Sequence, residues 1–417
     1  MILSLHNHPV SLLSPPVLPD VGVLAIVPDR WGGVWQPRHQ VVTRLAKYFN
    51  VVWVDPAVEW RDLWFRGKWK QCDVKLDDST LPGFRVYRHS MWVPKVFKPH
   101  SLRRLIEQQW LSQARQMLID QGCEKIVLYL WRPHFASVVD NVAHDLVCYH
   151  IDDEYSFSRV EQPLDRQEGK LIARAGQVFI HSPALWEKKS HLNTNSLLVP
   201  NGVDFNRFAT PRPEPDDLKP IARPRMGYVG VIQSTINWSL LHGLAKQHGD
   251  WSFVFVGPRG SLKPQDEAWI RQLLSLKNAH FLGGKSVHEL GAYAQNMNVC
   301  MMPYKIDDYT KFIYPLKLHE YLASGRPTIG TPIRTLQDYG HVITLASTAD
   351  EWSDALREAL APERNRPEQV EARRNLARTH DWAILVERIA QAMCNRLGTS
   401  VEEQFRTALT LQAGFVS

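Results

Sequence analysis

The chain alternates short apolar runs with amphipathic helical patterns, and it does so twice. From Val21 on, apolar runs that predict buried strands are followed by stretches with apolar residues at helical spacing. A segment with five prolines, residues 210–224, interrupts this pattern, which restarts at Met226. Because strands that alternate with helices form parallel sheets covered on both faces, the sequence predicts an α/β protein with two doubly wound halves.

The pattern also predicts where most elements lie. In the first half, strands are expected at 23–27, 51–54, 125–131, 146–150, 178–181 and 197–199, with a helix at 37–49. In the second half, strands are expected at 226–230, 253–256, 280–282, 299–302, 328–330 and 342–345, with helices near 236–247, 265–276, 286–295 and 317–324. From about Ala349 the pattern is helical to the end, whereas residues 59–110 follow neither pattern.

Composition limits the classes of protein that need to be considered. The 417 residues suffice for two domains, and a hydrophobic content of 44% with 22% charged residues is typical of soluble globular proteins. No apolar run is long enough for a transmembrane helix, and the proline-rich start without basic residues does not resemble a secretory signal. Five dispersed cysteines without a CxxC spacing favour reduced thiols in the cytoplasm over disulfides or zinc. The net charge of +6 permits an anionic partner, either nucleic acid, phosphates or an acidic membrane surface.

The segment 314–332, YPLKLHEYLASGRPTIGTP, is the strongest candidate for a binding site. It predicts a helix, with Leu316 and Leu318 on its apolar pattern, followed by a short buried strand. Lys317 and Glu320 share a face of this helix, whose N-terminus favours anions. A cation for phosphate beside a carboxylate for a sugar diol suits a nucleotide-sugar, although an amphipathic helix with a surface ion pair would show the same pattern.

Glycines and basic residues follow other predicted strands. In the second half, Gly230 and Arg259 follow two strands and are candidates for phosphate contacts through backbone N–H groups and a guanidinium. In the first half, Trp31, Gly32 and Gly33 follow the first strand and predict a loop that approaches an acceptor or a phosphate closely. The loop lacks a GxGxxG pattern, so a dinucleotide site is not supported.

Asp152 and Asp153 follow the strand at 146–150, where open α/β sheets place functional groups. Either carboxylate is a candidate base for an acceptor hydroxyl, and the alternative is a solvated acidic loop or a helix N-cap. His134, after the strand at 125–131, is a weaker candidate because lone histidines often have structural roles. Neither this pair nor the pair Asp307-Asp308 has further ligands at useful spacing, so no tightly bound metal is expected.

Residues 59–110 interleave aromatic and basic side chains. This mixture suits contact with an anionic membrane surface, and it also suits single-stranded nucleic acid or a core with solvated cations at its rim. The predicted membrane contacts are Trp60, Trp64, Phe65, Lys68, Trp69 and Lys70.

With these residues in view, the chain resembles the GT-B glycosyltransferases of bacterial polysaccharide assembly. The resemblance rests on PNGVD at 200–204 with Phe208, on NAHFLG at 278–283 with His288-Glu289-Leu290 and Tyr293, on the pattern P-x-K-x-x-E-Y-x-A-x-G-x-P at 315–327, and on Trp382. These motifs cover most of residues 200–385 in the expected order, and the resemblance over residues 1–200 is thin.

The resemblance implies two Rossmann-like domains facing a cleft. It implies an N-terminal acceptor domain (1–208), a linker (209–224), a nucleotide-sugar domain (225–385) and a C-terminal helical tail (386–417) that packs back on the first domain. Glu320 would bind the donor ribose and Lys317 the diphosphate, with Tyr314, Leu316, Leu318, Gly230 and Arg259 around the donor. Many relatives carry a second glutamate at the position of Phe312, so the sugar contact of that glutamate is missing here and the stereochemical outcome stays open.

The expected activity is therefore a metal-independent transfer of a sugar, of the hexosyltransferase type, with no cofactor. The donor would be a UDP- or GDP-sugar and the acceptor a glycan or a lipid-linked sugar of cell-surface polysaccharide synthesis. The enzyme is expected in the cytoplasm, with peripheral membrane contact and no nucleic acid partner. The alternatives are a nucleotide-sugar epimerase of the same fold, which needs no acceptor, and a non-catalytic protein that binds nucleotide-sugars or glycans.

Overall fold

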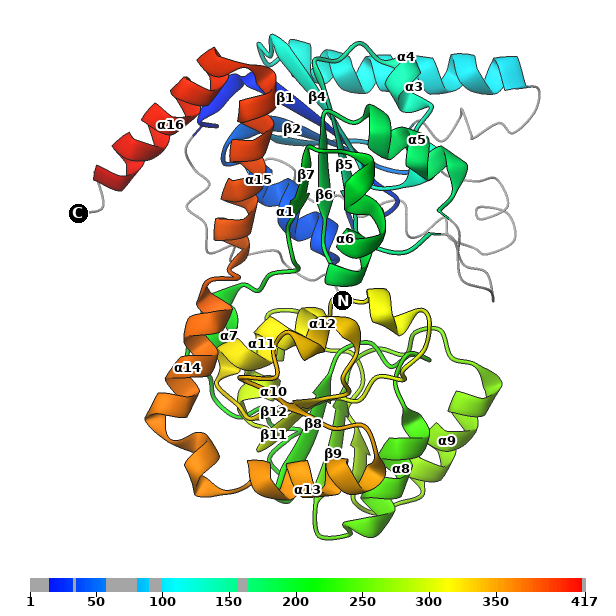
Figure 1. Ribbon diagram of the computed structural model, residues 1–417, viewed down its shortest axis with the longest axis vertical. Coiled ribbons are helices and arrows are strands. Elements are labelled where there is room, and N and C mark those ends of the chain that lie inside the picture. Colours follow the sequence, from blue (N-terminus) through cyan, green and yellow to red (C-terminus); the bar gives the residue numbers. More distant parts are fainter. Residues whose placement is uncertain (1–14, 33–34, 58–80, 90–99, 156–163, 415–417) are drawn as a thin grey trace. The chain divides into compact units, whose positions relative to one another are not determined.

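The computed structural model describes residues 15–32, 35–57, 81–89, 100–155 and 164–414. The chain forms two compact units. Unit 1 comprises residues up to Ile180 together with Lys189–Val199 and Val386–Ser417, and unit 2 comprises His181–Lys188 and Pro200–Leu385. Figure 1 shows a sheet of parallel strands with helices around it in each unit.

Unit 1 contains a seven-stranded parallel sheet in the order β3-β2-β1-β4-β5-β6-β7. Its strands are β1 (Leu18–Ile26), β2 (Phe49–Val54), β3 (Phe84–Tyr87), β4 (Lys125–Leu130), β5 (Leu146–Ile151), β6 (Gln177–Ile180) and β7 (Ser196–Leu198). The helices that connect these strands along the chain are α1 (Pro37–Leu45), α3 (His100–Ile119), α4 (Val138–Asn141), α5 (Arg166–Arg174) and α6 (Pro183–Lys189). All of α6 except its last residue belongs to unit 2. The strand order reverses between β1 and β4, so their carboxyl ends diverge there into loops on opposite sides of the sheet, which is the usual position of a ligand in such folds.

The C-terminal helices α15 (Trp382–Leu397) and α16 (Thr399–Gly414) bring the chain back to unit 1. The Tyr48 hydroxyl donates to Glu387 at 3.1 Å, and the Tyr48 ring lies 5.4 Å from that of Phe405. Lys125 at the start of β4 donates to the Leu397 carbonyl at 3.1 Å. These contacts lie at the amino ends of the strands β2 and β4.

Unit 2 contains a six-stranded parallel sheet in the order β10-β9-β8-β11-β12-β13. Its strands are β8 (Arg225–Val229), β9 (Ser252–Val256), β10 (Ala279–Phe281), β11 (Val299–Met302), β12 (Thr328–Gly330) and β13 (Thr344–Leu345). Its helices are α7 (Phe205–Ala209), α8 (Trp238–Gln247), α9 (Pro264–Leu274), α10 (Leu290–Gln295), α11 (Leu316–Ser324), α12 (Arg334–Gln337), α13 (Ala349–Ala359) and α14 (Pro367–Arg378).

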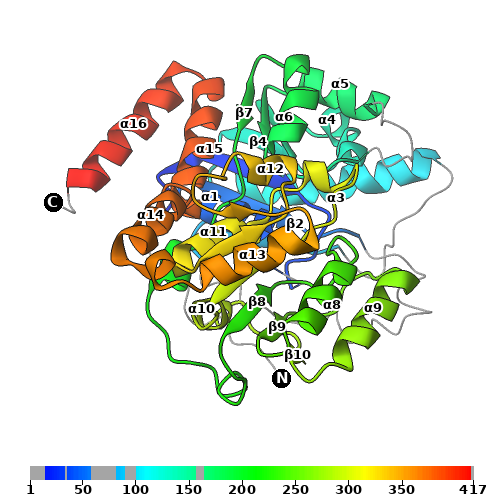
Figure 2. The same ribbon diagram turned by 60° about the horizontal axis from the view of Figure 1, so that its bottom comes forward.

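Both faces of the unit 2 sheet are buried. Val254 and Val256 pack on one face with residues of α10 and α11, while Phe253 and Phe255 pack on the other with residues of α8, α9 and α13. Figure 2 shows α8 and α9 side by side next to β8 and β9. Successive side chains of β9 thus point to opposite faces of the sheet, and helices cover both faces.

The predicted fold class, two Rossmann-like α/β domains, is confirmed, and the predicted strands match the observed ones within a few residues. Strand β3 and helix α3 were not predicted, because β3 lies within, and α3 begins within, the stretch 59–110 that followed neither periodicity. The compact units also divide at Val199 and Pro200 rather than after residue 208, and Leu218 and Ile221 of the expected linker are buried in the unit 2 core.

The assignment of the domains to acceptor and donor stays a prediction. None of the helices among the described residues has the length and apolar character needed to cross a membrane.

Candidate active site

Two glycine loops meet at the carboxyl ends of the central strands of unit 2. Gly230 directly follows β8 with φ +151°, and Gly257 directly follows β9 with φ +152°. A Cβ atom at Gly257 would lie 2.0 Å from the Gly230 carbonyl oxygen, and one at Gly230 would lie 2.3 Å from Cε of Lys317. Only glycine permits this backbone geometry and this close approach, so the two loops form a backbone surface beside the Lys317 side chain.

Lys317, in the first turn of α11, extends over this surface. Its Nζ lies 4.9 Å from the centre of the Tyr228 ring. Burial raises the pKa of Tyr304, and the nearby ammonium of Lys317 opposes that rise. No carboxylate among the described residues pairs with Lys317. A cation without a counter-ion among the described residues, next to helix N–H groups that have no intrahelical acceptor, is suited to bind an anion.

Glu320 lies one turn further along α11 and keeps part of its side chain exposed. Burial raises its pKa to about 7, against the opposing effects of Lys317 and Arg207. Glu320 has neither a hydrogen-bond donor nor an ion-pair partner among the residues described. The surface ion pair with Lys317 that was the alternative to a binding site is therefore not formed. A carboxylate in this state has its acceptor capacity available for a ligand with hydroxyl donors.

The other predicted donor residues differ in what they can offer a ligand. Leu316 begins α11 and is partly exposed, whereas Leu318 is fully buried in the core. Tyr314 is buried, and its hydroxyl lies 2.7 Å from Nε2 of His319. Arg259 has a 62% exposed side chain, and its Nη2 lies 4.0 Å from Glu267. Gly230 and Lys317 thus lie together, with Glu320 one turn further along α11, whereas Arg259 is an exposed side chain in the neighbouring loop after β9.

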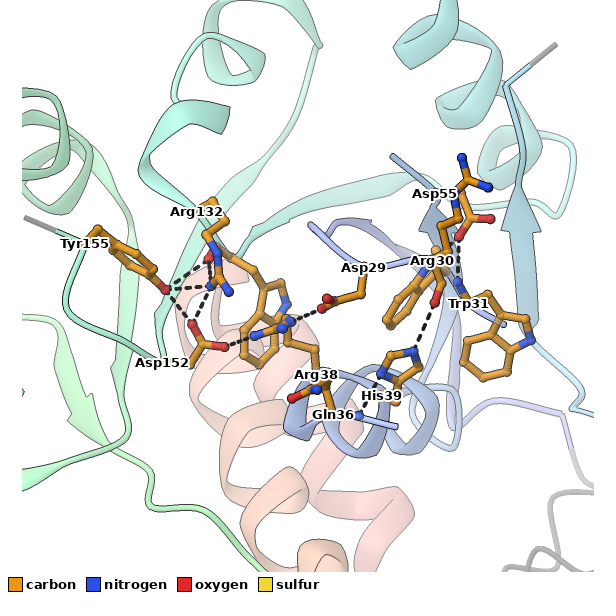
Figure 3. Close-up of polar contacts among 12 residues, drawn as sticks. Asp29, Arg30, Trp31, Gln36, Arg38, His39, Asp55, Arg132, Asp152 and Tyr155 are labelled. Carbon is orange, nitrogen blue, oxygen red and sulfur yellow. Dashed lines mark hydrogen bonds and ion pairs between the residues drawn. The ribbon is translucent and has the colours of Figure 1, made fainter. Parts of the chain in front are cut away.

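In unit 1, Asp152 lies at the centre of a network of charges at the carboxyl ends of β1, β4 and β5 (Figure 3). Its Oδ1 accepts from Nη1 of Arg132 at 2.6 Å and from the Tyr155 hydroxyl, and its Oδ2 accepts from Nη1 of Arg38. Nε of Arg38 donates in turn to Asp29. Three donors already occupy both oxygens of Asp152, so this carboxylate is better suited to hold the arginines than to accept a proton from a substrate.

Asp153 has a different environment. Its Oδ1 accepts from the backbone N–H of Glu154 at 2.8 Å, and it has no ion-pair partner within the described ranges. Burial, and then the charge of Asp152, raises its pKa to about 6. The next residue, Glu154, is buried and anchored 3.5 Å from Nζ of Lys189. Of the two candidate bases, Asp153 is therefore the one with acceptor capacity and a pKa near neutrality.

The loop after β1 is tied down by aromatic and polar contacts (Figure 3). The Trp31 N–H donates to Oδ1 of Asp55 at 2.8 Å, and the buried Trp31 ring lies 4.7 Å from that of Phe84. Burial lowers the pKa of His39 to about 4, and its neutral ring accepts from the Gln36 N–H at 3.1 Å. Trp31 therefore anchors the loop, and its backbone N–H, which is bonded to Asp55, is not available for a phosphate. Gly32 is exposed at the loop, and Gly33 lies outside the described residues.

The remaining predictions receive less support from the geometry. His134 is exposed in the short helix Pro133–Phe135, with its ring 4.2 Å from that of Phe135. The predicted membrane contacts Trp60, Trp64, Phe65, Lys68, Trp69 and Lys70 all lie outside the described residues. The described part of the chain contains no cluster of His, Cys, Asp and Glu suited to a metal ion.

Sequence reasoning missed Arg38 and Arg132, the partners of Asp152. Arg132 comes two residues after the end of β4, and Arg38 lies in the first turn of α1. The rule that directed attention to Asp152, position after a strand, applies equally to Arg132 and would have found it. Arg38 carried no such signal, because its approach to Asp152 depends on the pairing of β1 with β4 in the sheet.

Comparisons with known proteins agree with this geometry. The family described as "Glycosyl transferases group 1" matches residues 225–362, which include the Gly230, Lys317 and Glu320 cluster. A protein of Bacillus subtilis (strain 168), TuaH, named as a teichuronic acid biosynthesis glycosyltransferase, is 29% identical over 382 residues. The match covers 84% of this chain and 91% of that protein.

Solved structures with the same fold include an Escherichia coli trehalose-6-phosphate structure bound with UDP-2-fluoro glucose. It has a TM-score of 0.61 and 10% identity, and the match covers 91% of this chain and 99% of that one. Another is Anabaena Alr3699/HepE in complex with UDP and glucose, with a TM-score of 0.59 and 13% identity over 90% of this chain and 99% of that one. At these identities the likeness concerns the fold.

Proposed function

We propose that this glycosyltransferase of the GT-B fold binds a UDP- or GDP-sugar as the donor in unit 2. Unit 2 contains the residues that match the family "Glycosyl transferases group 1". Lys317 and the first turn of α11 would bind the diphosphate, and Glu320 would accept hydrogen bonds from the ribose hydroxyls. UDP is present in the two related structures named above, which supports a uridine nucleotide as the first candidate.

One observation carries this proposal. A lysine and a glutamate that share a helix face, each without an ionic partner in the described chain, lie beside the glycine loop that ends the central strand of the sheet. Unpaired charges at least partly withdrawn from solvent cost free energy unless a ligand pairs them. A phosphate and a sugar diol would do so together, because the first supplies negative charge and the second supplies hydroxyl donors.

The reaction moves the donor sugar from its diphosphate to an acceptor hydroxyl. As the bond to the diphosphate breaks, negative charge grows on the leaving oxygen, and Lys317 with the α11 N-terminus would stabilise that charge. In unit 1, we assign Asp153 to the acceptor hydroxyl, as the group that accepts its hydrogen bond. Asp152 would position this loop through Arg38 and Arg132.

The acceptor we propose is a glycan or a lipid-linked sugar of a cell-surface polysaccharide, in line with the name of the B. subtilis relative. A lipid-linked acceptor would require the enzyme to work at a membrane surface, which is the role predicted for the aromatic and basic residues between Trp60 and Lys70. That contact stays a prediction, as does independence from metal.

With the donor saturating, so that protonation of Glu320 does not limit donor binding, we expect the activity to fall as the pH drops below about 6. Asp153 must be ionised to accept from the acceptor hydroxyl, and its pKa is raised to about 6. Asp153→Asn should lower kcat/KM about tenfold to a hundredfold and flatten this limb of the pH profile. Transfer rates measured from pH 5 to 8 for both proteins test this. An unchanged acidic limb in Asp153→Asn would assign the titration to another group.

The donor assignment is tested with thermal unfolding in the presence of UDP-, GDP- and TDP-sugars. A ligand that binds only the folded protein raises the melting temperature by mass action, so one nucleotide-sugar should stabilise the wild type. Glu320→Ala should lose most of that stabilisation, and the exposed Glu368→Ala on α14 should keep it. The assay belongs near pH 8, where Glu320, with a pKa of about 7, is ionised. Equal stabilisation of wild type and Glu320→Ala by every ligand would refute the donor site.

A further inference from the structure

The Arg132 guanidinium in unit 1 is held by one of its nitrogens (Figure 3). Nη1 contacts Oδ1 of Asp152 at 2.6 Å, the Tyr155 hydroxyl at 2.7 Å and the Trp131 carbonyl at 2.8 Å. The guanidinium also lies 4.9 Å from the centre of the Tyr155 ring. Four contacts to a single group leave it little rotational freedom, so the orientation of the whole planar fork is set in advance of any ligand.

The other edge of the fork has no partner within the described ranges. Nε and Nη2 of Arg132 donate to none of these residues, although the side chain is only 18% exposed. These two nitrogens are not among the buried polar atoms that lack a partner, so this edge of the guanidinium is open to a ligand that approaches from solvent. The Nε–Nη2 edge is also one that binds a carboxylate or a phosphate through two parallel hydrogen bonds.

The free edge of Arg132 favours an anion as that ligand because of its geometry. Among the described residues, Arg38 pairs with two carboxylates, Asp29 and Asp152, whereas Arg132 forms one ion pair, with Asp152, through Nη1. Asp153 follows in the chain, but its side chain bonds to the Glu154 N–H and not to the fork. Against the lowering effect of burial, the charges of Asp152 and Asp153 hold the pKa of Arg132 above its usual value, so the guanidinium stays fully charged. Arg132 also lies at the strand end where the sheet order reverses, the usual position of a ligand in such folds.

We propose that the Nε–Nη2 edge of Arg132 binds an anionic group of the acceptor substrate, either a phosphate or a sugar carboxylate. The proposal rests on the proposed function, since it identifies the chemical class of the acceptor. Asp152 and Tyr155 then act as positioning residues that hold the fork, and the acceptor is bound next to Asp153. A phosphate would come from a lipid diphosphate and a carboxylate from a uronic acid residue.

The test uses the full chain with saturating UDP, which fills the anion site at Lys317, and follows the binding of three probes by isothermal titration calorimetry. Inorganic pyrophosphate represents the lipid diphosphate, glucuronate the uronic acid, and glucose a neutral sugar. We expect pyrophosphate or glucuronate to bind the wild type more tightly than glucose, and the tighter of the two identifies the source of the negative charge.

Arg132→Lys keeps the positive charge at this position and removes the planar guanidinium. Lysine can still pair with Asp152 but cannot form two parallel hydrogen bonds, so the anion should bind about tenfold more weakly or worse. Arg174→Lys changes an exposed arginine paired with Asp140 in the same unit and should leave binding unchanged. Retained UDP binding shows that each variant is folded.

The outcomes of this experiment are distinct. Anion binding that Arg132→Lys leaves intact overturns the proposal, and so does an anion that binds no more tightly than glucose. If UDP does not bind, GDP replaces it. Failure of both nucleotides to bind contradicts the proposed function instead, and the anion site is then judged by the dependence of glucuronate binding on Arg132.

Discussion

Lys317→Gln is expected to lower kcat/KM for sugar transfer by about 10²–10³, which corresponds to roughly 3–4 kcal/mol of lost transition-state stabilisation. The reason lies in the surroundings of the Lys317 ammonium group. This group lies against Gly230 and 4.9 Å from the Tyr228 ring centre, without a carboxylate partner in the described chain. Because its charge is not neutralised within unit 2, it can act fully on the negative charge that grows on the leaving diphosphate. The loss should therefore appear mainly in kcat.

A matched control separates this effect from a general loss of positive charge. Lys277 is exposed between α9 and β10, at the amino end of β10, whereas Lys317 lies at the carboxyl ends of the strands. Lys277→Gln should therefore keep wild-type kinetics. Steady-state measurements with the donor identified by thermal unfolding provide the comparison. If Lys317→Gln keeps its kcat, the leaving group is stabilised elsewhere, and the assignment of the α11 N-terminus to the diphosphate fails.

The sequence predicted the strands well because most of them are buried on both faces. The runs at 253–256 and 299–302 are continuous and apolar, and a continuous apolar run can be recognised without knowledge of its neighbours. Strand β3, FRVY, has an exposed arginine within four residues and follows a stretch rich in tryptophan and lysine. Its assignment depends on its pairing with β2, which is a tertiary property.

The candidate site was predictable to the extent that one element carries it. Lys317 and Glu320 lie on one helix, so their spacing alone placed them together. The network around Asp152 joins residues from β1, β4, β5 and α1, and its composition follows from the sheet order. For this reason the sequence indicated Asp152 as a possible base, whereas the structure shows an aspartate already bonded to two arginines and a tyrosine. The burial of Trp31 could not be predicted from the sequence either, because its partners Asp55 and Phe84 lie at the end of β2 and in β3.

Asp152→Ala is expected to destabilise unit 1 by about 3–5 kcal/mol, the usual cost of removing one partner from a buried ion pair. The Asp152 side chain is 6% exposed. Among the described residues, its loss removes the only carboxylate partner of Arg132 and one of the two carboxylate partners of Arg38. Hydrogen–deuterium exchange followed by mass spectrometry should show faster exchange in β4 and β5, while peptides from the unit 2 sheet stay unchanged.

The comparison with Asp140→Ala shows why burial decides the size of this effect. Asp140 also pairs with an arginine, Arg174, at 2.6 Å, but both side chains are more than half exposed. Water replaces such a partner at little cost, so the change should be within about 1 kcal/mol. Equal effects of the two substitutions would mean that solvent reaches the Arg38–Asp152–Arg132 network freely. Arg132 would then be an ordinary hydrated arginine, and the argument for a preorganised fork would fall with it.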